Sequence, residues 1–192
     1  MKIGVLAAQG AFAEHIAALE RLAAEGVAVR LPGELKGVEG LIIPGGESTT
    51  ISRLIAEYDL VKAIGGLGRE GLPIWGTCAG MILLARQITG NSAKSLGLMD
   101  ITVTRNAFGR QVDSFETGLK IPALGKKEFP GVFIRAPRIE ECAGGVEVLA
   151  RLDDGTIVAA RQGKLLATAF HPELTDDLRF HRYFLDIVSG DR

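Results

Sequence analysis

One cysteine stands between two glycines where the chain passes from a strand-like run to a helix-like run. Cys78 lies in Gly76-Thr77-Cys78-Ala79-Gly80, between the apolar runs 73–75 and 81–84. A nucleophile on a tight strand-to-helix corner needs small residues two positions away on either side, because a β-carbon there would collide with the bent backbone. The free N–H groups of the first helical turn also favour a thiolate. These residues point to nucleophilic catalysis by Cys78. The alternative is a small buried hydrophobic residue.

A histidine and a glutamate two residues apart could complete the nucleophilic site. His171 and Glu173 occur in Ala169-Phe170-His171-Pro172-Glu173. Proline restricts the preceding residue to extended conformations, so we expect both side chains to face the same way. A carboxylate beside an imidazole holds its tautomer and stabilises the imidazolium that forms when the ring takes a proton. Taken alone, the pair could be a surface histidine and an acid at a helix N-terminus. The cysteine at the strand-to-helix corner favours a triad of Cys78, His171 and Glu173. His15 and His181 fall in predicted helices, where we expect solvated faces.

Acyl transfer also requires N–H donors for the oxyanion. The backbone N–H of Ala79, directly after the nucleophile, is one candidate. Pro44-Gly45-Gly46 follows another buried strand and could supply the second from Gly46, since a glycine pair lets a peptide turn its N–H toward the site or away from it. A plain tight turn is the alternative.

Composition narrows the class of protein. The chain has 192 residues, which is the size of one domain, and a net charge of −1 without a basic run, so nothing favours nucleic acid or an anionic membrane. The apolar start is too short for a signal peptide, and no stretch could span a bilayer. Cys78 and Cys142 lie far apart and outside metal-ligand spacing, which argues against a disulfide, a zinc site or another metal site. We expect a cytoplasmic protein that needs no cofactor, with Cys142 structural.

Hydrophobic patterning in the first half predicts buried strands that alternate with amphipathic helices. Such alternation is typical of a parallel sheet covered on both faces. The expected strands are 2–7, 27–31, 40–43 and 73–75, and the expected helices are 12–23, one that begins near 51, 60–69 and 79–87.

The second half has a different pattern, with several strand-like runs. We expect the turns at Gly144-Gly145 and Asp153-Asp154-Gly155 to be hairpin connections between the later strands. We expect antiparallel strands added to the sheet, Trp75 in the core, and a solvated loop around Arg138, Glu140 and Glu141. The expected strands are 99–104, 132–135, 146–152, 156–160 and 165–170, followed by a helix over 176–188. The fold class is therefore α/β, a three-layer, flavodoxin-like, mostly parallel sheet.

Three segments together resemble class I, or triad-type, glutamine amidotransferases. They are Gly76 to Gly80, Pro44 to Ser48 and Phe170 to Glu173. More narrowly, the chain resembles the glutaminase subunit of pyridoxal 5′-phosphate synthase, nearly from end to end. The segments that carry this resemblance are Gly4-Val5-Leu6 with Gln9-Gly10, Pro44 to Thr50, Arg105 to Phe115, Gly131 to Pro137 and His171 to Thr175. Ala8 departs from that pattern, because the family more often carries a bulkier apolar residue there.

The resemblance implies one glutaminase domain over residues 1–192 that hydrolyses L-glutamine through a thioester on Cys78, with His171 as acid and base and Glu173 orienting it. It also implies that the ammonia passes to a (β/α)₈-barrel synthase subunit in a large ring-shaped complex, and that the glutaminase works only when docked. An arginine suits the α-carboxylate of the substrate, although Arg105 or Arg135 could equally form a structural ion pair and Ile134 could be strand core. The implied glutamine-binding residues are Gly46, Glu47, Ser48, Arg105, Ile134 and Arg135.

Other functions share these motifs. The chain could be a glutaminase that supplies another pathway, such as imidazole glycerol phosphate or carbamoyl phosphate synthesis. It could also be a free-standing cysteine hydrolase or deglycase-like protein on the same scaffold. A non-catalytic regulatory subunit is disfavoured by the complete triad.

Overall fold

The structure is a computed structural model that describes residues 1–8, 10–46, 59–90, 95–105, 107 and 114–192. The helices are α1 (Phe12–Arg21), α3 (Leu60–Arg69), α4 (Ala79–Leu84) and α5 (Arg179–Ser189), with short 3₁₀ turns at Pro32–Leu35, Pro122–Leu124 and Pro172–Leu174. The first strands are β1 (Lys2–Leu6), β2 (Glu25–Val29), β3 (Gly40–Ile43), β4 (Ile74–Thr77), β5 (Ala85–Thr89) and β6 (Met99–Thr104). The later strands are β7 (Ser114–Leu119), β8 (Phe129–Ile134), β9 (Arg138–Cys142), β10 (Glu147–Arg151), β11 (Ile157–Gln162) and β12 (Leu165–Thr168).

A mixed sheet runs through the described part of the chain. Its order is β2-β1-β3-β4-β12-β11-β9-β6-β5, with β10 also paired to β11. Strands β2, β1, β3, β4 and β12 are parallel, and β12, β11, β9 and β6 are joined by antiparallel pairings. Every residue of β3 and β4 is buried, as expected for strands covered on both faces. The predicted α/β fold, parallel first and antiparallel later, is confirmed.

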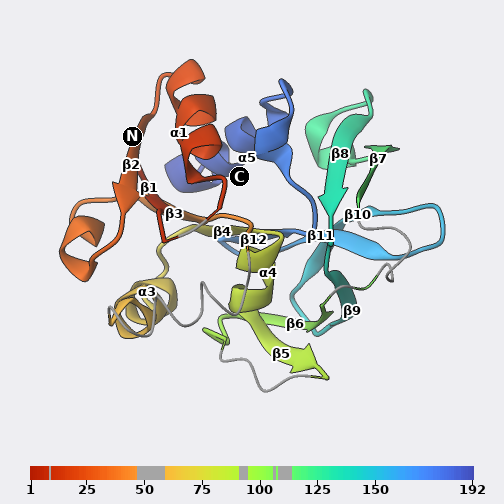
Figure 1. Ribbon diagram of the computed structural model, residues 1–192, viewed down its shortest axis with the longest axis horizontal. Helices are drawn as coiled ribbons and strands as arrows, with labels where there is room; N and C mark the ends of the chain where they lie inside the picture. Colours follow the sequence, from red (N-terminus) through yellow and green to blue (C-terminus); the bar gives the residue numbers. More distant parts are fainter. Residues whose placement is uncertain (9, 47–58, 91–94, 106, 108–113) are drawn as a thin grey trace.

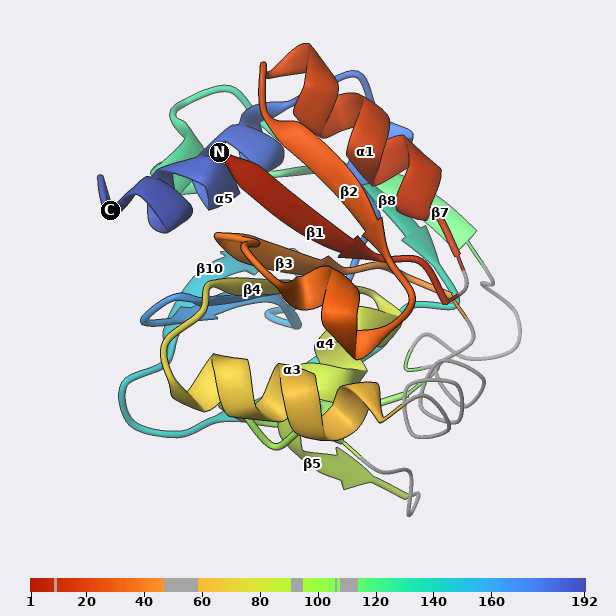
Figure 2. The ribbon, with the colours of Figure 1, turned by 90° about the vertical axis from the view of Figure 1, so that its left-hand side faces the viewer.

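Helices cover both faces of this sheet. In Figures 1 and 2, α1 and α5 lie on one face and α3 and α4 on the other. The core between β4 and α5 is aromatic: Trp75 is fully buried and stacks on Phe180 with ring centroids 6.0 Å apart. The prediction that Trp75 belongs to the core is confirmed. Among the helices that the structure describes, none has the length and apolar character needed to cross a bilayer.

Two predicted elements were wrong in type. The helix expected to reach Gln87 ends at Leu84, and Ala85–Thr89 forms β5, which pairs with β6 in parallel. The expected loop around Arg138 is β9, in which Ile139 is buried while Arg138 and Glu140 pair outward at 2.9 Å. In both cases pairing with β6, a contact that local patterning does not reveal, decides the conformation.

Smaller differences concern boundaries and one missed strand. Ser114–Leu119, not predicted as a strand, forms β7 and pairs with β8 in a separate ribbon. Gly144-Gly145 does not close a hairpin, because β9 and β10 both pair with β11, whereas the turn at Asp153 to Gly155 does connect the paired strands β10 and β11. The last helix begins at Arg179, whose backbone N–H donates to Asp177 Oδ1 at 3.1 Å. The helix expected near residue 51 lies outside the described residues.

Parallel strands bring their carboxyl ends to one edge of the sheet. The segments that follow β1, β3, β4 and β12 therefore emerge side by side, and they contain Gly10, Gly45, Cys78 and His171. The strand order changes direction between β1 and β3, and crevices at such points are the usual ligand sites of open α/β sheets.

Candidate active site

Cys78 occupies a strained corner between β4 and α4. Its backbone has φ +49° and ψ −105°, an unusual conformation for a residue with a side chain, and its N–H donates to the Thr168 carbonyl oxygen at 2.8 Å. A β-carbon on Gly76 would lie 2.4 Å from the carbonyl carbon of Gly80. A β-carbon on Gly80 would lie 1.9 Å from the carbonyl oxygen of Ile43. The predicted steric need for glycine on both sides of Cys78 is confirmed.

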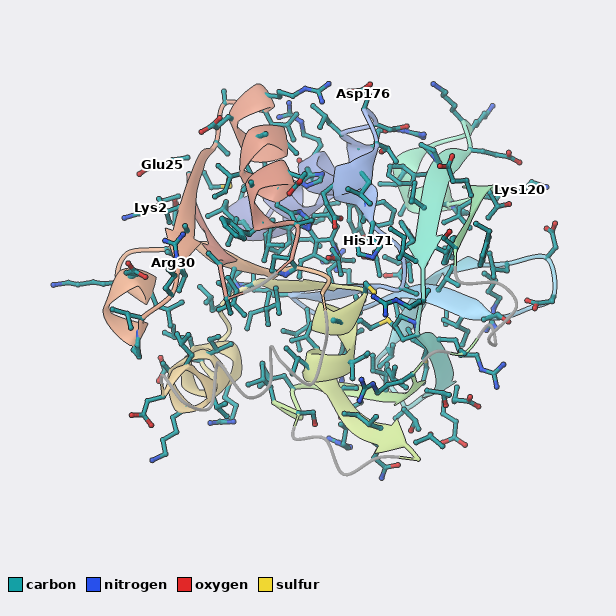
Figure 3. The ribbon with its side chains drawn as sticks, in the orientation of Figure 1. Lys2, Glu25, Arg30, Lys120, His171 and Asp176 are labelled. Carbon is teal, nitrogen blue, oxygen red and sulfur yellow. The ribbon has the colours of Figure 1, made fainter. Side chains whose placement is uncertain are left out.

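His171 and Glu173 are joined by a short hydrogen bond. His171 Nδ1 lies 2.8 Å from Glu173 Oε1, and both side chains are almost fully buried. The backbone N–H of His171 donates to the Val132 carbonyl oxygen at 2.8 Å. The expectation of an extended segment holds only in part. Pro172–Leu174 forms a 3₁₀ turn, which folds the carboxylate back onto the ring. Figure 3 shows His171 near the middle of the molecule, whereas the other labelled side chains, all charged, lie toward its periphery.

Electrostatics favour a charged His171. Burial alone lowers the pKa of this imidazole, but hydrogen bonds to Cys78 and Glu173 and the charges of both residues raise it more, to about 10. Burial alone raises the pKa of Glu173, but His15 and His171 lower it below its ordinary value. Because Nδ1 of His171 faces Glu173, the other ring nitrogen is left for Cys78. The three residues predicted to form a triad are therefore brought together in the predicted order.

The loop after β3 packs against the same histidine. The N–H of Gly45 donates to Thr77 Oγ1 at 3.0 Å, and a β-carbon on Gly45 would lie 2.3 Å from His171 Cε1 and 3.2 Å from Cys78 Cβ. The carbonyl oxygen of Gly45 lies against Gly10, where a β-carbon would approach it to 1.7 Å. Gly46 has φ +156° and is exposed, and Ala79 is buried at the start of α4.

The other expected substrate-binding residues divide into two groups. Glu47 and Ser48 lie outside the described residues. Cys78 Sγ lies 3.9 Å from the Ile134 carbonyl oxygen, so the end of β8 borders the cysteine. Ile134 is 37% exposed, which rules out the interpretation of its side chain as strand core.

Arg105 and Arg135 lie in adjoining segments. Arg135 is exposed and has φ +42°, another strained backbone beside the cysteine, and Arg105 is partly buried after β6. The N–H of Ala107 donates to the Ala136 carbonyl oxygen at 3.1 Å and ties the two segments together.

The expectation that His15 and His181 decorate solvated faces was wrong. Both are fully buried, His15 on α1 and His181 on α5. His15 Nε2 lies 3.3 Å from Glu173 Oε2, and His15 Nδ1 lies 3.0 Å from His181 Nε2. The sequence spacing could have indicated this burial, because His15 shares a helical face with Leu19, and His181 shares one with Leu185. Within the described residues, no group of three or more His, Cys, Asp or Glu is arranged to hold a metal ion.

Known proteins share both the sequence and the fold. The pyridoxal 5′-phosphate synthase subunit PdxT of Herpetosiphon aurantiacus is 61% identical over 190 residues, covering 97% of this chain and 100% of that protein. The same-named subunit of Dehalococcoides mccartyi is 60% identical over 191 residues, covering 98% of each chain. A crystal structure of a glutamine amidotransferase superposes with a TM-score of 0.92 at 50% identity, covering 97% of this chain and 98% of that one. The model of the SNO glutamine amidotransferase family matches residues 5–189. The chain therefore belongs to the SNO glutamine amidotransferase family.

Proposed function

We propose that Cys78, His171 and Glu173 hydrolyse the side-chain amide of L-glutamine, releasing glutamate and ammonia. Membership of the family sets the reaction class: the chain is a glutamine amidotransferase whose glutaminase activity supplies ammonia for pyridoxal 5′-phosphate, vitamin B6, synthesis. The observation that carries the residue assignment is the 2.8 Å contact between His171 Nδ1 and Glu173 Oε1, together with a hydrogen bond between the same imidazole and Cys78.

The geometry supports a two-step reaction. The Cys78 thiolate attacks the amide carbon, and the imidazolium of His171 donates its proton to the departing nitrogen, which leaves as ammonia and a thioester remains. His171, now neutral, takes a proton from water, and the resulting hydroxide attacks the thioester and releases glutamate. Glu173 remains ionised and holds the imidazole in orientation throughout, consistent with its lowered pKa.

Binding of the substrate needs donors at two places. The N–H groups of Ala79 and Gly46 would stabilise the oxyanion that develops on the amide oxygen. A guanidinium from Arg105 or Arg135 would engage the α-carboxylate, and Arg135 is exposed beside the cysteine. The assigned glutamine-binding residues are Gly46, Glu47, Ser48, Arg105, Ile134 and Arg135.

The ammonia needs an acceptor on a second protein. The curated relatives are named as subunits of pyridoxal 5′-phosphate synthase, which supports a synthase partner for this chain. We assign this partner as a (β/α)₈-barrel subunit, assembled with the glutaminase in a large ring-shaped complex. It would dock on the face where the active site opens, around Gln9-Gly10, the loop after β3 and the turn that carries Cys78. Docking would turn the Gly45-Gly46 peptide into its active orientation.

The test is ammonia release from L-glutamine, measured with and without the barrel subunit, for the wild-type chain and for Cys78→Ala. We expect activity only from the wild type and only with the partner. Full activity without the partner would favour a free-standing hydrolase, and activity in Cys78→Ala would refute the assigned nucleophile. Circular dichroism of Cys78→Ala serves as the control for folding.

A further inference from the structure

We propose that His15 is a positioning residue for the triad: its Nε2–H group holds the far oxygen of the Glu173 carboxylate and is itself oriented by His181. This inference rests on the proposed function, since it concerns the same triad. His15 contacts the other carboxylate oxygen from the one that faces His171, and it cannot touch the substrate because its side chain, on α1, is fully buried.

The contacts place His15 at the junction of two parts of the site. Its Nε2 lies 3.3 Å from Glu173 Oε2 and 3.4 Å from Thr77 Oγ1. Thr77 Oγ1 also accepts the N–H of Gly45 at 3.0 Å. Helix α1 packs on the Pro172–Leu174 turn that carries Glu173. One ring nitrogen therefore adjoins both the carboxylate of the triad and the support of the glycine loop.

The protonation states follow from burial. Desolvation lowers the pKa of His15, opposed by the charge of Glu173, and it lowers the pKa of His181 to about 2, so both rings are neutral at pH 7. The other charged groups that act on this pair are His171 and Glu14 on His15, and Arg21 on His181. A neutral imidazole carries one N–H and one acceptor nitrogen.

One arrangement of protons suits both the Glu173 contact and the His181 contact of His15. Glu173 is an ionised acceptor, so the proton of His15 must be on Nε2, where it faces that carboxylate. His15 Nδ1 is then an acceptor, and the 3.0 Å contact requires His181 to donate from Nε2. The remaining nitrogen, His181 Nδ1, is an unprotonated acceptor, and it has no hydrogen-bond partner among the described atoms. An unpaired acceptor is tolerated more readily than a buried unpaired N–H.

This arrangement explains what His15 contributes. Glu173 Oε2 is fully buried, and among the described residues it accepts no well-aligned hydrogen bond, so the His15 N–H at 3.3 Å is the polar contact that the structure gives this oxygen. Without that N–H, the carboxylate would lose this contact and could rotate away from His171. Losing a hydrogen bond to a charged group should lower kcat by about 10- to 100-fold. The KM for glutamine should stay within about twofold, because His15 is not at the substrate surface.

The experiment compares His15→Leu with His15→Gln, each assayed as the complex with the barrel subunit. The amide of Gln can place an N–H near the position of Nε2, whereas Leu fills the space without a donor. Leu19→Ala is the matched control, because Leu19 is fully buried one turn along the same helix and has no polar contact. We expect a low kcat for His15→Leu, most of the wild-type kcat for His15→Gln, and an unchanged kcat for the folded fraction of Leu19→Ala.

Two results would overturn the inference: a kcat within twofold of wild type for His15→Leu, or equally low values for folded Leu and Gln variants. If His15→Leu does not fold, His15→Asn replaces it, because the shorter amide cannot reach Glu173. Equal kcat values for Asn and Gln would then refute the role. The proposed function fails separately, through an inactive wild type or an active Cys78→Ala.

Discussion

The ring of His171 lies directly over the α-carbon of Gly45. A β-carbon on Gly45 would sit 2.3 Å from His171 Cε1, closer than any real contact allows, while Gly45 itself remains anchored by its N–H to Thr77. The loop that precedes the expected oxyanion donor is thus packed closely against the general base, with no room for a side chain between them.

Gly45→Ala should therefore abolish most of the activity with little effect on the fold. The added methyl group must displace the imidazole from Cys78 or push the loop away, and a misplacement of about 1 Å can cost on the order of 100-fold in rate. Gly144→Ala is the control, since a β-carbon there meets nothing within 4 Å. Steady-state glutaminase kinetics and thermal melts of both variants check this. Wild-type kcat in Gly45→Ala would mean that the ring is not held as described.

Gly80→Ala should instead destabilise the whole domain. Its β-carbon would lie 1.9 Å from the Ile43 carbonyl oxygen, and backbone cannot move aside as a side chain can. Overpacking of this kind costs roughly 1–3 kcal/mol of unfolding free energy. Gly66→Ala on α3 offers a matched helical control, because its β-carbon would meet open space and should slightly stabilise the helix. Urea unfolding measures both; equal midpoints would contradict the close approach of α4 to β3.

Glu173→Gln should lower the pKa of His171 and the rate together. The carboxylate helps raise that pKa to about 10, so its loss lets the imidazolium release its proton at lower pH. We expect kcat to fall by about 10³- to 10⁴-fold, as when a triad carboxylate is replaced elsewhere. The pKa can be read from the ring resonances of His171 in an NMR titration of each protein. An unshifted His171 titration in the variant would disprove this coupling.

The raised pKa of His171 also has a consequence for stability. Between pH 6.5 and about 10, the folded chain keeps a proton on His171 that the unfolded chain releases, so this contribution to stability is lost as the pH rises through that range. In Glu173→Gln the pKa of His171 is lower, so the loss of stability with rising pH should extend over a narrower pH range.

His181 should make the protein sensitive to mild acid. Burial, with a further contribution from the charge of Arg21, lowers the pKa of His181 to about 2, while an unfolded histidine titrates near 6.5. Below pH 6.5 the unfolded state binds a proton at His181 and the folded state does not. The free energy of unfolding therefore falls by about 1.4 kcal/mol from this group for each unit by which the pH is lowered. Replacing it with leucine, His181→Leu, should flatten the dependence of the urea midpoint on pH between 6.5 and 5. Parallel curves for the two proteins would show that His181 is protonated in the fold.

The sequence alone determined a large part of this protein. Cys78 between two glycines, the His-Pro-Glu segment and the glycine pair after a buried strand each predict a local geometry, because glycine and proline act on the backbone at their own positions. The parallel half of the sheet could also be predicted from the sequence, since strands buried on both faces must be continuously apolar.

Tertiary contacts decided those features that depend on residues far apart in the sequence. Ala85–Thr89 and Arg138–Cys142 are strands because both pair with β6, and the polar side of β9 resembles a loop when that pairing is unknown. The buried pair of His15 and His181 was missed for a related reason. Residues 166 positions apart form a 3.0 Å contact beneath the triad, and only the packing of α1 and α5 on the same face of the sheet brings them there.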